Sequence, residues 1–200
     1  MMIASVRNQL KLAATLVTLF SAQLGIVGCT SSDSGTPMPI PATMQTPGSP
    51  DAGDQIDRMI GAALDQVGDQ YVFGAEVSES DPDPDVWDQG EFTQWSAYQV
   101  GSQIPGSSFE QYLDLKEKGL LIPIEQGLDT PGALLFHFSE EPALDSGRPS
   151  EAHVAISLGD SQTVEAQSPE AGVIIDQAAG RFEYAALLPN VDYPTPAPST

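Results

Sequence analysis

Thiol and imidazole, the side chains best suited to act as a nucleophile and as a general base near neutral pH, are scarce in this 200-residue sequence. The sequence holds one cysteine, Cys29, and two histidines, His137 and His153. A single cysteine can form neither an internal disulfide nor a thiolate metal cluster. Glu165 follows His153 along the chain. If the segments on either side of residues 159–160 pair as a hairpin, the ends that carry His153 and Glu165 lie side by side.

The cysteine stands at the end of an apolar run, residues 12–26, that follows Arg7 and Lys11. This order is typical of an export signal, and the run is too short to span a membrane comfortably. Residues 26–29 resemble the lipobox of bacterial lipoproteins. The resemblance implies cleavage after Gly28, lipid on Cys29, and a location in the cell envelope, on a membrane and facing the periplasm or the exterior. The alternative is an ordinary secretory signal with an incidental cysteine.

Charge and composition divide the remaining chain. The formal net charge is −21, which excludes nucleic-acid binding through a basic surface. Residues 29–53 are rich in Ser, Thr, Gly and Pro and are expected to form a disordered tether. Residues 54–189 are long enough for one domain, and residues 190–200 form a second Pro-rich, disordered segment.

Hydrophobic periodicity predicts helices first and strands after them. Helical spacing covers residues 54–68, 90–100 and 108–118, the last with Ser108 as its expected cap. Alternation predicts strands at 133–138, 153–158, 162–164, 172–175 and 184–188. His137 lies on the outward side of this alternation and is predicted to be a surface residue. Helices followed by neighbouring strands indicate an α+β fold with a mainly antiparallel sheet.

Five strings in this domain share the order and spacing of one set of motifs: residues 63–74, 87–95, 104–112, 131–136 and 153–160. Together they resemble the NlpC/P60 peptidoglycan endopeptidases. The resemblance implies a papain-like α+β fold with a nucleophilic cysteine at the start of a helix. It also implies a histidine base on the sheet and a polar third residue on the following strand. A helix N-terminus stabilises a thiolate, and the third residue orients the histidine.

The resemblance assigns His153 as the base, Glu165 as the third residue, and Tyr71 and Asp88 as substrate-binding residues. The nucleophile position departs from the family, because Gln89 stands where the family has cysteine. A carboxamide is no nucleophile at neutral pH, and Cys29 is in the signal. The thioester mechanism therefore cannot run.

These residues predict an extracytoplasmic lipoprotein whose degenerate domain binds peptidoglycan stem peptides or a cell-envelope protein without cleaving them. Two alternatives remain open. One is a residual hydrolase or acyl-transfer activity using His153 and Glu165, and the other is a scaffold with a vestigial groove. We expect no cofactor and no metal. The acidic run at residues 79–85 lacks the Gly and the final Glu of an EF-hand loop, which favours a solvated loop.

Overall fold

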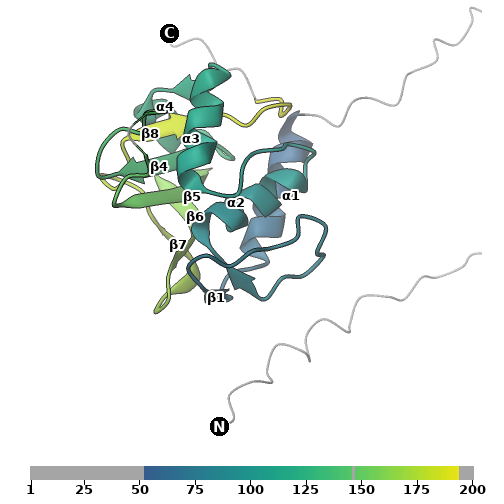
Figure 1. The fold of residues 1–200 in the computed structure, drawn as a ribbon. Helices are drawn as coiled ribbons and strands as arrows, with labels where there is room; N and C mark the ends of the chain where they lie inside the picture. The colour runs from purple at the N-terminus through teal and green to yellow at the C-terminus, as the bar shows by residue number, and fades with distance from the viewer. Residues whose placement is uncertain (1–51, 146, 194–200) are drawn as a thin grey trace, which may run out of the picture. The chain divides into compact units, whose positions relative to one another are not determined.

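The computed structural model describes residues 52–145 and 147–193 (Figure 1). The predicted signal, Cys29 and almost all of the predicted tether lie outside the described residues. Among the described residues, no helix combines the length and the apolar character needed to cross a membrane.

A six-stranded antiparallel sheet forms the centre of the domain and confirms the predicted α+β class. Every predicted strand is present. In spatial order the strands are β3 (Leu121–Ile122), β8 (Tyr184–Ala186), β4 (Leu134–Phe138), β5 (Ala152–Gly159), β6 (Gln162–Ser168) and β7 (Gly172–Gln177). Two further strands, β1 (Gln70–Tyr71) and β2 (Val86–Trp87), form a separate parallel pair.

The hairpin expected at residues 159–160 joins β5 to β6. Gly159, Asp160 and Ser161 all have positive φ, at 82°, 50° and 56°, which closes a tight turn. Strand β6 continues to Ser168. Glu165 therefore lies inside the strand, whereas the sequence had suggested that it lies at the strand's end. The strand continues because residues 162–168 pair with β7, whereas the register with β5 covers residues 162–164.

Four helices accompany the sheet: α1 (Ala52–Leu64), α2 (Gln89–Tyr98), α3 (Ser108–Glu117) and the short α4 (Ile124–Leu128), which periodicity did not predict. The expected cap of α3 was wrong by one residue. Ser107 is the N-cap, because its hydroxyl accepts from the Glu110 amide at 3.3 Å and donates to the Glu110 carboxylate at 2.9 Å. The amide that an N-cap side chain accepts from lies two or three residues further on, which fits Ser107 and Glu110.

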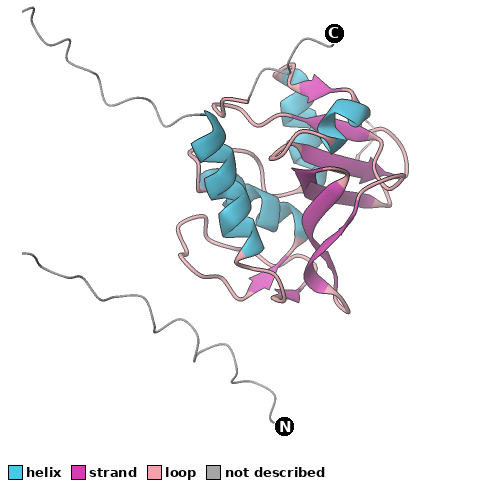
Figure 2. Ribbon diagram, turned by 180° about the vertical axis from the view of Figure 1, so that it is seen from behind, coloured by secondary structure: helices cyan, strands magenta, loops and turns pink. Residues whose placement is uncertain are grey.

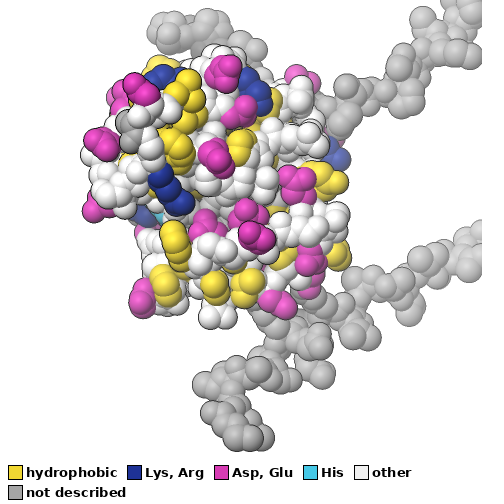
Figure 3. All heavy atoms as spheres, in the orientation of Figure 1, with side chains coloured by type: hydrophobic (Ala, Val, Ile, Leu, Met, Phe, Trp, Pro, Cys, Tyr) yellow, Lys and Arg dark blue, Asp and Glu magenta, His cyan; other side chains and the backbone are white. Residues whose placement is uncertain are grey.

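Helix α2 is buried on most of its surface, which explains its weak amphipathic pattern. Phe92 and Trp95 pack against Trp87 at the centre of the larger hydrophobic cluster. That cluster lies between α1–α3 and one face of the sheet, and a smaller cluster with α4 covers the other face (Figure 2). Acidic side chains are spread over the face of the molecule seen in Figure 3.

Packing continues past Pro189, where the domain boundary was predicted. The Tyr193 hydroxyl donates to the Gly132 carbonyl at 3.0 Å and accepts from the Leu188 amide at 3.2 Å. The Asp192 amide donates to the Gln55 side chain at 3.4 Å. These contacts tie the described end of the chain back to the domain.

Candidate functional site

The site begins at the N-terminus of α2, where Asp88 caps the helix. One carboxylate oxygen accepts from the Gly90 amide at 3.0 Å, as an N-cap does. The other accepts from the Gly74 amide at 2.8 Å, and so holds the loop after β1 against α2. These contacts leave Asp88 buried. Its side chain also lines a surface hollow.

Gln89 is the first residue of α2, and its side chain bridges the helix to β5. The carboxamide nitrogen donates to the Ala152 carbonyl at 2.8 Å. Since a backbone carbonyl can only accept, this bond fixes which end of the carboxamide is the oxygen. The oxygen then lies 3.0 Å from Nδ1 of His153.

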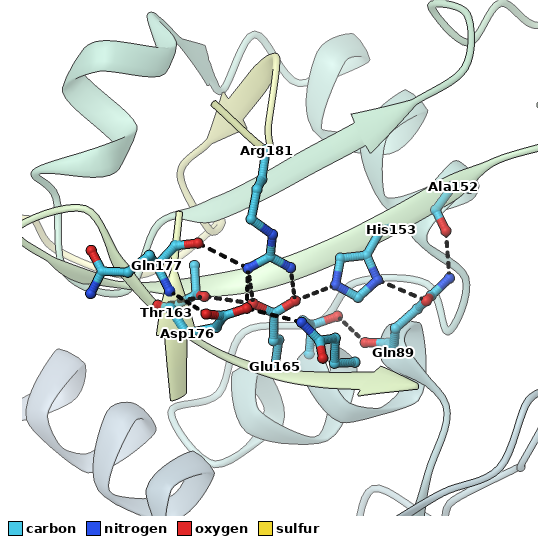
Figure 4. A network of polar contacts seen from close by, with 10 residues as sticks. Gln89, Ala152, His153, Thr163, Glu165, Asp176, Gln177 and Arg181 are labelled. Atoms are coloured by element: carbon cyan, nitrogen blue, oxygen red, sulfur yellow. Dashed lines mark hydrogen bonds and ion pairs between the residues drawn. The ribbon is translucent and has the colours of Figure 1, made fainter. Parts of the chain in front are cut away.

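His153 lies between two acceptors (Figure 4). Its Nδ1 faces the Gln89 oxygen and its Nε2 lies 2.5 Å from the Glu165 carboxylate. Both ring nitrogens are therefore engaged by oxygen atoms of the site. The ring also stacks on Phe182, with centroids 6.1 Å apart. The structure thus brings together Gln89, His153 and Glu165, which the sequence had grouped.

Glu165 is fully buried and is surrounded by donors. Arg181 grips it with Nη1 and Nη2, each at 2.8 Å, and the Thr163 hydroxyl donates to it at 2.7 Å. Burial by itself raises the pKa of Glu165, but the bonds from His153 and Arg181 outweigh burial and lower the pKa to about 2. The carboxylate is ionised throughout the physiological range and holds the His153 ring in place.

Arg181, Thr163 and Asp176 belong to this network and were missed from the sequence. Asp176 accepts from Arg181 at 3.1 Å and extends the ion pair to β7. Thr163 shares a strand face with Glu165, so strand alternation could have suggested it. Arg181 comes from the turn that precedes β8, and its only sequence signal is the rarity of basic residues in this chain.

Tyr71, predicted to bind substrate, lies in the larger hydrophobic cluster and is buried. Burial and the nearby charge of Asp88 raise the pKa of its hydroxyl, while Arg148 opposes that shift. Tyr71 is therefore close to Asp88, but it is not among the residues that line the surface hollow next to Asp88. Its role in binding stays a prediction.

That hollow, which we call the Asp88 hollow, has a volume of about 400 Å³. Arg148 lines the hollow, and its guanidinium lies 5.7 Å from the centroid of the exposed Phe73 ring. The other lining residues are Gly74, Ala75, Glu76, Asp88, Glu91, Gly106, Ser107 and Glu110. The hollow thus combines carboxylates with one cation and one aromatic ring.

No hydroxyl in α2 replaces the missing thiol. The Thr93 hydroxyl is buried and donates to the Gly90 carbonyl at 2.9 Å, and the Ser96 hydroxyl donates to the Phe92 carbonyl at 2.8 Å. Within residues 52–145 and 147–193, no group of three or more His, Cys, Asp or Glu side chains is placed to hold a metal ion.

Comparison with known proteins identifies the fold. No protein-family model matches the sequence, and no curated protein does. The P60 domain of an antigen from M. avium subspecies paratuberculosis matches with a TM-score of 0.52 and 22% identity over 71% of this chain and 98% of that domain. The chain has the fold of an NlpC/P60 domain.

Two further solved structures agree on this fold. The peptidoglycan hydrolase RipB from Mycobacterium tuberculosis matches with a TM-score of 0.51 and 23% identity, over 68% of this chain and 65% of RipB. NlpC2 from Trichomonas vaginalis matches with a TM-score of 0.51 and 17% identity, over 76% of this chain and 49% of NlpC2. The predicted NlpC/P60 fold is confirmed.

Proposed function

We propose that this protein is a degenerate NlpC/P60 protein that binds peptidoglycan stem peptides without cleaving them. The observation that carries the proposal is the hydrogen bonding of the Gln89 side chain at the start of α2. Its carboxamide fills the position at the start of α2 where the resembled family has its nucleophile, and both of its polar ends are hydrogen-bonded. The remaining acid–base pair, His153 and Glu165, is kept in place around it.

The same geometry disfavours a residual hydrolase that uses His153 as a base. Both ring nitrogens already have hydrogen-bond partners, Gln89 on one side and Glu165 on the other. General-base catalysis requires a nitrogen lone pair within reach of the reacting proton. Binding requires no such lone pair.

The Asp88 hollow supplies the binding surface. Peptide stems carry both ammonium and carboxylate groups, and the hollow offers carboxylates at Glu76, Glu91 and Glu110 and a guanidinium at Arg148. The proposal includes lipidation of Cys29 and display in the cell envelope. The tether predicted between Cys29 and the domain would let the binding surface reach the cell wall.

Calorimetric titration of soluble muropeptides into the full chain tests this function, with product analysis by mass spectrometry. We expect saturable binding, unchanged muropeptide masses, and affinity at least about fivefold weaker in Arg148→Ala, which removes a charge-assisted contact. Arg58→Ala is the matched control, because Arg58 lies on α1, is exposed, and carries the same charge. Absence of muropeptide binding, or an equal loss of affinity in Arg148→Ala and Arg58→Ala, would contradict the proposal.

A further inference from the structure

A second hollow lies on the His153 side of the site, with a volume of about 330 Å³. We call it the Arg181 hollow. Its polar lining comes from His137, His153, Gln167, Arg181 and Glu183, and Gly180 and Phe182 complete it. His137 and His153 are register partners on β4 and β5. The hollow therefore brings together the only two histidines of the chain and an arginine.

The guanidinium of Arg181 has one edge left over. The edge formed by Nη1 and Nη2 grips Glu165, and the outer side of Nη1 donates to the Gln177 carbonyl at 3.0 Å and to Asp176. The edge formed by Nε and Nη2 donates to no residue in the part of the chain that the structure describes. A guanidinium presents its donors in a rigid fork, so this edge offers two parallel N–H groups.

The surroundings favour a planar anion on that edge. The Arg181 side chain is 31% exposed, and its guanidinium carbon lies 5.1 Å from the centroid of the Phe182 ring. The one carboxylate that shares the hollow, Glu183, is held by Nδ1 of His137 at 3.0–3.1 Å. The Gln167 carboxamide also lines the hollow; its nitrogen donates one N–H to Asp176 at 3.0 Å and carries a second N–H.

We propose that the Nε–Nη2 edge of Arg181 binds a carboxylate group of a ligand seated in the Arg181 hollow. Two parallel N–H···O bonds to a carboxylate are the geometry that an arginine fork favours. This inference rests on the proposed function, because it assigns the place where the free carboxylate of a bound peptide docks. It makes Arg181 serve three carboxylates, Glu165 and Asp176 within the chain and one from the ligand.

A pair of small probes tests the inference on the full chain: N-acetyl-alanyl-alanine with a free carboxylate and the same peptide with a C-terminal amide. We expect the free acid to bind at least about tenfold more tightly, since a charge-assisted bidentate contact is lost in the amide. Working at about 0.15 M salt screens the negative charge of the chain. Equal affinities, or no binding of the free acid, would overturn the inference.

Nuclear magnetic resonance locates the contact without any variant. The Arg181 Nε–H and Gln167 side-chain amide signals should shift when the free acid is added and stay in place with the amide. Arg181→Lys keeps the charge but loses the fork, so the tenfold preference should fall to near one, whereas Arg58→Lys should retain it. If muropeptides bind while the Arg181 signal does not move, the inference fails and the proposed function stands.

Discussion

Glu165 shows how a single side chain sets the state of the site. Its carboxylate takes donors from His153, Arg181 and Thr163 while being fully buried. Breaking a buried ion pair by removing one partner leaves an uncompensated charge. This buried network beside Gln89 supports the proposal that the site binds a ligand without a nucleophile.

Glu165→Gln should lower the free energy of unfolding by about 3 kcal/mol at pH 7, because it leaves Arg181 and His153 without their common counter-ion. The folded pKa of about 2 lies below the value of 4.5 for an unperturbed glutamate. The stabilisation is therefore complete above the unfolded pKa and is lost as the pH falls from about 5 toward 2. Urea unfolding across this pH range measures both effects.

Glu170→Gln is the matched control, since Glu170 is an exposed glutamate beyond the end of β6. The difference in the free energy of unfolding between wild type and Glu165→Gln should shrink at low pH. The corresponding difference for Glu170→Gln should stay small at every pH. If Glu165→Gln loses the same amount of stability at every pH, then altered packing, and not the ion pair, causes the loss.

Helix α2 and the loop before α3 lie so close together that there is no room for a side chain at Gly90. A Cβ at Gly90 would lie 2.1 Å from the Gly106 carbonyl oxygen, which is backbone and cannot move aside cheaply. The Gln111 side chain closes the same contact, donating to the Gly90 carbonyl at 2.9 Å and to the Pro105 carbonyl at 2.7 Å. The glycine that follows Gln89 is therefore part of the packing.

Gly90→Ala should destabilise the domain by about 1–3 kcal/mol, the usual range for overpacking. Gly61→Ala is the matched control in α1, where a Cβ meets nothing within 4 Å. Gly61→Ala should raise stability by about 0.5–1 kcal/mol, because alanine favours helix and restricts the unfolded chain. Thermal unfolding of both variants checks the opposite signs. Equal effects would contradict the close approach at Gly90.

The elements that sequence could predict are those with enough residues to show a period. The three longer helices and the five longer strands follow from spacing alone, and the β5–β6 hairpin, which the sequence reading took as a condition, is present. Strands β1, β2 and β3 have two residues each, and α4 has five, so tertiary contacts define them. In the site, His153 and Glu165 could be paired from the hairpin. Arg181 could not, because it arrives from a turn with no periodic signal.

At the scale of the whole molecule, the net charge of −21 opposes compaction through self-repulsion. Raising sodium chloride from about 0.01 M to about 1 M shortens the screening length from roughly 30 Å to roughly 3 Å. The Tm of the full chain should therefore rise by several degrees over this range. Sucrose at matched osmolality is the control, and a Tm that falls or stays constant with salt would contradict the role of repulsion.

Under the proposed function, the domain has the site of a cysteine peptidase without the nucleophile, and a cysteine at position 89 should restore cleavage. The direct measurement compares the full-length wild type with Gln89→Cys, incubated with muropeptides and followed by mass spectrometry. Gly90 is left unchanged, because a larger residue there would meet Gly106. Wild type should bind and leave the peptides intact, while Gln89→Cys should cleave them. Cleavage by wild type, or a folded Gln89→Cys that binds but never cleaves, would contradict the account.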